Sequence, residues 1–153
     1  MDSIIQPRIQ NSFDAQTMMK TLGARLLKAD DGLAEIEAPI LFGSLQQHGY
    51  AHACLAFAIG DSAAGYAALS LMPDDHEVLT TEIKINLLAP ATGNLLVACG
   101  SVIKPGKRLV IVQSDVFSMA NDQKTHVAHL VGTMIPVPKQ AEGRIVRKTI
   151  NSR

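Results

Sequence analysis

The chain has 153 residues, of which 47% are hydrophobic, and its 14 Lys and Arg balance 14 Asp and Glu. This length suits a single domain that buries its own core without disulfides, and no linker or repeat divides it. The zero net charge and the few aromatic residues (four Phe, two Tyr, no Trp) give no argument for nucleic-acid or membrane partners, and we expect neither.

The two cysteines, Cys54 and Cys99, lie in apolar stretches and do not form a CxxC pair. Both are therefore predicted to be buried thiols of a protein in a reducing compartment. Residues 1–13 lack the charged start and apolar run of a signal peptide. A cytoplasmic location is expected.

The N-terminal stretch 1–13 shows no clear hydrophobic period and contains Pro7. It is expected to be a loosely held arm or a short strand that pairs elsewhere. Asp14 is the expected cap of a short helix over residues 15–22, and Gly23 is its expected stop.

Two short strands are predicted at residues 24–28 and 33–38. They flank Asp30-Asp31-Gly32, which has the chemistry of a hairpin turn. Residues 39–47 then lead to the longest apolar run of the chain.

This run, residues 53–72, is rich in Ala and contains no Pro, which favours a helix. Its apolar residues go all the way round, so the helix is expected to be wrapped by protein on every side. The length is near that of a membrane span, but polar residues and glycines interrupt the run, and no second such segment exists. The interruptions are Gly60, Asp61, Ser62, Gly65 and Ser70.

Asp61 is the informative residue of this helix, because a buried carboxylate without a partner costs several kcal/mol or shifts its pKa. Buried acids of this kind are candidates for function. The alternative is that Asp61 accepts hydrogen bonds from a neighbouring strand or subunit and only fixes packing. The residue alone does not decide between these two interpretations.

Four strands are predicted after the helix, at residues 78–88, 94–103, 108–119 and 124–135. The first has the clearest alternation of apolar and polar residues, which is typical of a strand with one buried face. The turns are short, so an antiparallel meander is expected, because parallel neighbours need long crossovers. The predicted fold class is α+β, with a long helix against an antiparallel sheet that curls round it.

The organisation predicted for the chain is a single domain with an N-terminal arm and short helix (1–23), a main body (24–138) and a C-terminal tail (139–153). The tail carries five Lys or Arg against one Glu. Such a segment is typical of a solvated, partly disordered end. A contribution to binding an anionic ligand is the alternative.

The helix start carries a recognisable spacing. Gln46-x-x-Gly49-x-x-His52-Ala53-Cys54, followed by Asp61, resembles the PaaI-like, phenylacetate-degradation-related acyl-CoA thioesterases, whose usual pattern is Asn-x-x-Gly-x-x-His-Gly-Gly with an acid nine residues after the His. Two later landmarks keep the family's order: Thr80-x-Glu82-x-x-Ile85-Asn86-x-Leu88-x-Pro90 and Gly106-Lys107-Arg108-Leu109. The resemblance covers roughly residues 35–136. It implies that residues 24–138 form a hotdog domain, a long central helix wrapped by a curved antiparallel sheet.

Two departures from the family pattern affect the helix start. Gln46 replaces the commoner Asn and keeps an amide that donates and accepts hydrogen bonds. Ala53 and Cys54 replace two glycines, which narrows the approach to the backbone. Both residues keep their backbone N–H groups, so catalysis is still expected.

The resemblance implies hydrolysis of an acyl-CoA thioester. The Ala53 and Cys54 amides at the helix start would stabilise the oxyanion of the reacting carbonyl. Asp61 would act as a general base on water or as a nucleophile that gives an anhydride, and both roles stay open.

Gln46 and Thr80 would orient the water or the carbonyl, and His52 would hold the loop that enters the helix.

One later turn would meet the phosphates of CoA, through Lys104, Gly106, Lys107 and Arg108. Ordinary solvated turn charges are the alternative. No cofactor is expected beyond the CoA of the substrate. No metal site is expected either, because His126 and His129 are three residues apart on a strand and should face opposite sides.

The spacing from His52 to Asp61 makes a further prediction. Nine helical residues turn through about 900° and rise roughly 13 Å, which places the helix start and Asp61 on opposite faces. A site that combines the helix start of one subunit with Asp61 of another would solve this, and the family does place its sites at a dimer interface. We therefore expect a homodimer, often paired further into a homotetramer.

Two other functions stay open at this point. One is a hotdog hydratase or dehydratase that acts on an enoyl or hydroxyacyl thioester, although such enzymes usually pair a catalytic His with an acid. The other is a non-catalytic acyl-CoA-binding protein in which Asp61 is structural. Fold alone does not decide among the three.

Overall fold

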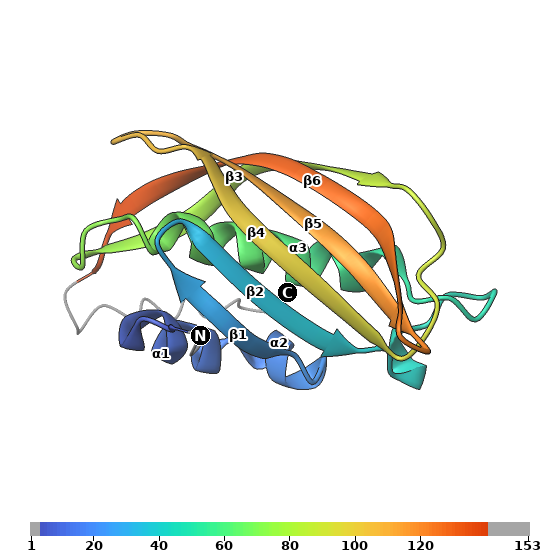
Figure 1. The fold of residues 1–153 in the computed structure, drawn as a ribbon. Coiled ribbons are helices and arrows are strands. Elements are labelled where there is room, and N and C mark those ends of the chain that lie inside the picture. The colour runs from blue at the N-terminus through green and yellow to red at the C-terminus, as the bar shows by residue number, and fades with distance from the viewer. Residues whose placement is uncertain (1–3, 141–153) are drawn as a thin grey trace, which may run out of the picture.

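The computed structural model describes residues 4–140 and consists of one long helix held in the concave face of a six-stranded antiparallel sheet (Figure 1). Its elements are α1 (Pro7–Ala15), α2 (Thr17–Thr21), β1 (Arg25–Asp30), β2 (Leu33–Pro39), the 3-10 helix η1 (Phe42–Ser44), α3 (Ala53–Leu69), β3 (His76–Leu87), β4 (Leu95–Lys104), β5 (Val110–Ala120) and β6 (Gln123–Pro138). The predicted α+β hotdog architecture is confirmed.

The strand order is β1-β2-β4-β5-β6-β3, and every neighbouring pair is antiparallel. The predicted meander is therefore right for β4, β5 and β6 but wrong for β3, which pairs with β6 at the far edge. The connector 88–94 is the reason. It is held near the helix start, where the Ala51 N–H donates to the Ala91 carbonyl and the Ile40 N–H donates to the Asn94 carbonyl. The chain thereby leaves the edge of the sheet that holds β3, and β4 pairs with β2 instead.

The hairpin between β1 and β2 is confirmed. Asp31 and Gly32 both have positive φ, as a tight two-residue hairpin turn requires. Asn121 and Asp122 do the same between β5 and β6. These turns bring together the neighbours predicted from their sequences.

The N-terminal stretch is helical, so the predicted loose arm is wrong. Pro7 stands in the first turn of α1, where its fixed φ suits a helix and its missing N–H costs nothing. Asp14 lies inside this helix and does not cap the next one. Ile9 and Phe13 are buried, so α1 is packed on the main body. The strand alternative is limited to a single bridge from Ile5 to β1.

Helix α3 is buried all round over its second half but on one side only over its first half, so the prediction that protein wraps it all round is right for the second half alone. All of residues 63–69, nearly two turns, are buried, whereas in the first half the buried residues are those at positions 55, 56, 59 and 60. On the opposite side Cys54 is exposed, Phe57 is 37% exposed and Asp61 is half-buried. The prediction of a buried Cys54 is wrong for the same reason, and Cys99 is partly buried.

The close approach of α3 to the sheet depends on Gly100 of β4. A Cβ placed on this residue would lie 2.3 Å from the backbone carbon and oxygen of Ala63. Because that contact is with helix backbone, a side chain at Gly100 cannot be accommodated by a change of rotamer. We expect Gly100→Ala to lower the free energy of unfolding by about 3 kcal/mol.

The measurement is urea unfolding of wild type, Gly100→Ala and the control Gly43→Ala. A Cβ on Gly43 would meet nothing within 4 Å, so the control should unfold close to wild type. Equal midpoints for all three proteins would show that the helix does not rest on this glycine.

Within residues 4–140, no helix is long and apolar enough to cross a membrane. Of the predicted basic tail, residues 141–153 lie outside the described residues. Lys139 is described, and its ammonium donates to the Asp74 carbonyl at 2.7 Å.

Candidate active site

Asp61 and Thr80, which are 19 residues apart, meet at a half-buried site between α3 and β3. The Thr80 hydroxyl donates to Asp61 Oδ1 at 2.8 Å and lies 3.2 Å from Met134 Sδ. Burial raises the pKa of the Asp61 carboxyl above its ordinary value, and the hydrogen bond from Thr80 opposes part of that rise. A carboxylate with a raised pKa beside a cavity has the properties of a general base.

The position of Thr80 depends on a break in the pairing of β3 with β6. Thr80 pairs with Met134 and Glu82 pairs with Thr133, so Thr81 is an extra residue. Such a bulge re-aims the side chains around it. Thr80 consequently shares the inner face of the sheet with buried Met134 and reaches α3.

The pocket at Asp61 has a volume of about 270 Å³. Opposite Asp61 and Thr80, its lining includes residues that the sequence did not single out. Gln16, next to α1, donates from its side-chain amide to the Tyr66 hydroxyl at 2.6 Å, and Ser12 Oγ lies 3.3 Å from the same hydroxyl. Burial raises the pKa of Tyr66. The signal for these residues in the sequence was Pro7, which begins α1 in a stretch that was predicted to be a loose arm.

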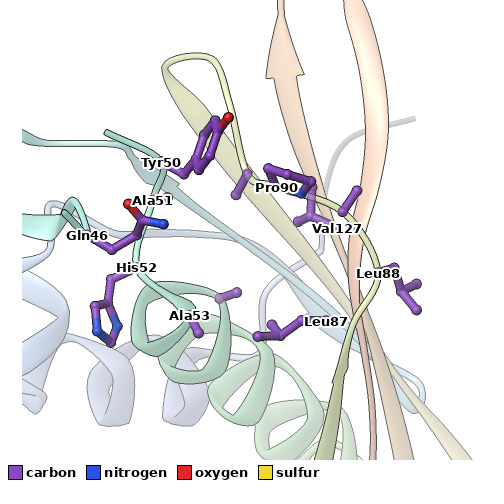
Figure 2. Close-up of a pocket in the computed structure, with 12 residues that line it drawn as sticks. Gln46, Tyr50, Ala51, His52, Ala53, Leu87, Leu88, Pro90 and Val127 are labelled. Atoms are coloured by element: carbon purple, nitrogen blue, oxygen red, sulfur yellow. The ribbon is translucent and has the colours of Figure 1, made fainter. Parts of the chain in front are cut away.

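A second pocket, of about 570 Å³, lies at the start of α3 (Figure 2). Gln46, His52 and Ala53 line it, together with the apolar connector after β3. His52 is the N-cap of the helix, and its Nδ1 accepts a hydrogen bond from the Cys54 N–H at 3.0 Å. The Gln46 side-chain oxygen accepts from the His48 N–H. The Gln46 NH₂ group is then the donor that this side chain can offer to the pocket.

This cap changes the expected oxyanion site. The Cys54 N–H already has a partner, so it is not the donor expected from the sequence while the cap is formed. Ala53 is the first helical residue, where N–H groups lack intrahelical partners. Within residues 4–140, its N–H makes no capping bond. One amide donor therefore remains at the helix start.

The structure does not bring all the predicted residues together in one chain. Gln46, His52 and Ala53 line the pocket at the helix start, whereas Asp61 and Thr80 line the other one. The two pockets have no lining residue in common. This separation agrees with the opposite faces expected from the helical spacing.

The predicted CoA-binding residues lie at a third place, around the turn between β4 and β5. Lys104 ends β4, and Lys107 and Arg108 follow in the turn. Gly106 and Lys107 line a pocket of about 570 Å³, which also includes Met72 beyond the C-terminal end of α3. These cations thus lie at the opposite end of α3 from Ala53.

The prediction that His126 and His129 face opposite sides is wrong. Val116 pairs with Ala128 and Phe117 pairs with His126, so Val127 is an extra residue in β6. This bulge returns His126 to the face that carries His129. Both rings contact the same oxygen of Asp115.

Comparisons with known proteins place the chain in a family. A model of the thioesterase superfamily matches residues 48–123. The chain is 34% identical to a thioesterase family protein from Silicibacter pomeroyi, over 86% of this chain and 97% of that one, with a TM-score of 0.84. No protein of curated function matches significantly.

Two further structures share the fold. The PaaI protein of the Escherichia coli phenylacetic acid degradation operon is 22% identical over 83% of this chain and 88% of that one, with a TM-score of 0.74. The BH2602 protein from Bacillus halodurans, solved with CoA, is 23% identical over 84% and 80%, with a TM-score of 0.72. The resemblance predicted from the sequence is confirmed, and the chain belongs to the thioesterase superfamily, with the hotdog fold.

Proposed function

We propose that this protein hydrolyses an acyl-CoA thioester to a free acid and CoA. The observation that carries the proposal is the Asp61–Thr80 pair, a half-buried carboxylate with a raised pKa at the edge of a pocket. Membership in the thioesterase superfamily supports the reaction class. A protein of this fold solved with CoA supports the substrate class.

The residues of the two pockets can divide the chemistry between them. Asp61 takes a proton from water, whose oxygen attacks the thioester carbonyl carbon. The Ala53 N–H stabilises the oxyanion, and Gln46 orients the carbonyl. When the oxyanion collapses, the C–S bond breaks and the CoA sulfur leaves with the proton returned by Asp61. Thr80 holds the carboxylate in place.

Direct attack by Asp61 is the second form of the same proposal. Its oxygen would bond to the carbonyl carbon, release the CoA thiolate and leave a mixed anhydride that water then hydrolyses. Water labelled with ¹⁸O distinguishes the two in a single turnover, because only the anhydride route can place an enzyme oxygen in the acid.

We also propose that each site combines two subunits of a homodimer. Support comes from the exposed side of α3, where Phe57 lies one turn before Asp61, and from β3 at the edge of the sheet. Leu79 of this edge strand is 55% exposed. An exposed edge strand beside apolar surface is a surface suited to a second copy. Pairing of dimers into a tetramer stays a prediction.

The test is light scattering at micromolar concentration, followed by complementation. Asp61→Asn and Ala53→Pro each damage one half of the site. When the two variants are co-expressed, we expect roughly a quarter of wild-type activity, because half of the dimers are mixed and each mixed dimer has one intact site. A monomeric mass, or no recovery in verified mixed dimers, would contradict a shared site while leaving thioester hydrolysis untouched.

For CoA, we propose that the turn after β4 meets the phosphates through Lys104, Lys107 and Arg108. A Cβ on Gly106 would lie 2.3 Å from the Leu109 carbonyl oxygen, so glycine allows this tight turn. The turn lies far along α3 from Ala53, and a second subunit would bring such a turn to the site. The cytoplasmic location also stays a prediction.

The first test of the function is free-thiol release from a panel of aryl and aliphatic acyl-CoAs. Turnover of any member supports hydrolysis, and the best substrate identifies the acyl group. Loss of enoyl absorbance from an enoyl-CoA would favour the hydratase alternative. Tight CoA binding with no thiol released would favour a binding protein in which Asp61 is a packing residue.

A further inference from the structure

Asp115, His126 and His129 form a cluster on the face of the sheet that points away from α3. Asp115 lies between buried Ser114 and Val116 of β5, so its side chain is on the outer face. Its Oδ1 lies 2.8 Å from His126 Nε2 and 2.7 Å from His129 Nδ1. All three candidate ligand atoms lie within 4.8 Å of one another.

The backbone holds these side chains in place. Asp115 pairs directly with His129 across β5 and β6, and the bulge at Val127 turns His126 to the same side. The His126 ring stacks on Phe117, with centroids 4.8 Å apart. Lys124 places its ammonium 3.9 Å from the centre of the same phenyl ring. The nearby positive charge is therefore engaged with an aromatic face.

We propose that this cluster is a binding site for a divalent transition-metal ion of the zinc class. Two imidazole nitrogens and a carboxylate oxygen are a ligand set that Zn²⁺ uses, with water free to complete a tetrahedron. Zinc bonds of about 2.0–2.1 Å place tetrahedral ligand atoms about 3.3 Å apart. The two distances from Asp115 Oδ1 to the imidazole nitrogens need to open by about half an ångström, and the distance between the two nitrogens, which is at most 4.8 Å, needs to close by no more than about 1.5 Å. The three side chains are 32–40% exposed, so they can move and an ion can reach them.

This site is separate from the proposed hydrolysis. None of its three residues lines the pockets at Asp61 or at the start of α3. The competing explanation is that Asp115 simply accepts hydrogen bonds from two histidines and ties β5 to β6. Direct metal binding distinguishes the two, because a hydrogen-bonded tie does not require an ion.

The experiment is titration of the metal-free full-length protein with Zn²⁺ by calorimetry, and with Co²⁺ followed by visible absorption. We expect one ion per chain and the intense visible bands of tetrahedral Co²⁺. His126→Gln and His129→Gln should each weaken binding at least about 100-fold, since even loss of an outer partner of a metal ligand costs 10- to 100-fold. His76→Gln is the matched control, because among residues 4–140 His76 contacts a single carboxylate, Asp75, at 2.7 Å, and the variant should bind like wild type.

Ring resonances of the wild-type histidines give a readout that needs no variant. Zn²⁺ should shift the signals of His126 and His129 and leave that of His76 in place. If the wild-type protein binds no Zn²⁺ up to millimolar concentration, or if the resonances of His126 and His129 do not respond, the proposal is overturned. Folded His126→Gln and His129→Gln variants that bind as tightly as wild type would overturn it as well.

Discussion

Replacing Asp61 with Asn is expected to lower kcat for the best acyl-CoA by at least about a hundredfold, the lower range for a lost general base. The change preserves size, and the remaining side-chain oxygen can still accept the hydrogen bond from Thr80. What disappears is the carboxylate that takes a proton or attacks the carbonyl. The measurement is thiol release under saturating substrate, for wild type and variant in parallel.

Asp122→Asn is the matched control for this change. Asp122 stands in the turn between β5 and β6 with a φ of 63°, a conformation that Asn tolerates well. It is absent from the lining of the Asp61 pocket, so its variant should keep full activity. An Asp61→Asn protein as active as this control would make Asp61 a packing residue and move the function towards binding.

The raised pKa of Asp61 predicts opposite pH trends for the activity and the stability of the wild-type protein. Burial raises the pKa of Asp61, so the ionised base is gained at a higher pH than for an ordinary carboxyl. The activity of wild type should rise with pH through that raised value. Because the folded state holds this proton more tightly than the unfolded chain, stability falls as pH rises through the same window.

Asn at position 61 cannot ionise. We therefore expect the variant to unfold at a higher temperature than wild type above the pKa of folded Asp61, and at the same temperature in acid below the unfolded value. Thermal unfolding across pH tests the sign. A variant that is less stable than wild type at neutral pH would contradict an unfavourable burial of the charge.

Local signals in the sequence gave the correct secondary structure over most of the main body. The Ala-rich run without Pro became α3, and alternating segments became the strands. Turn residues such as Asp31-Gly32 and Asn121-Asp122 specified their hairpins because they adopt positive φ at low cost. These features depend on neighbours in the sequence.

The errors arose where distant residues decide the outcome. The pairing of β3 with β6 depends on the path of the connector past Ala51, which no short pattern records. The bulge at Val127 shifts His126 by one position and so reverses its face. Of the site, the Asp61–Thr80 contact follows the order of the motifs. Ser12 belongs to α1, which forms within a stretch predicted to be a loose arm, and Gln16 is positioned by the end of that helix.

Ala53→Pro tests the other half of the site, and we expect it to lower kcat by about 10²- to 10³-fold, the cost of one lost oxyanion donor. Proline removes a single group, the N–H at the first position of α3, where proline is well tolerated. The preceding residue must be extended, and His52 already is, with φ −63° and ψ 143°. The helix should therefore form normally.

Ala53→Gly is the matched control, since it restores the glycine that is usual at this position in the family and keeps the N–H. It should remain active under the same assay, and circular dichroism should show equal helix content in wild type and both variants. The cap from His52 to the Cys54 N–H should persist, because neither change alters those groups. Two donors are common in such sites. Because the Cys54 N–H is engaged in the cap, the second donor would come from outside this amide pair, with the Gln46 NH₂ group as the candidate. Unchanged turnover in a folded Ala53→Pro protein would instead remove the helix start from the chemistry and leave the pocket at Asp61 to act alone.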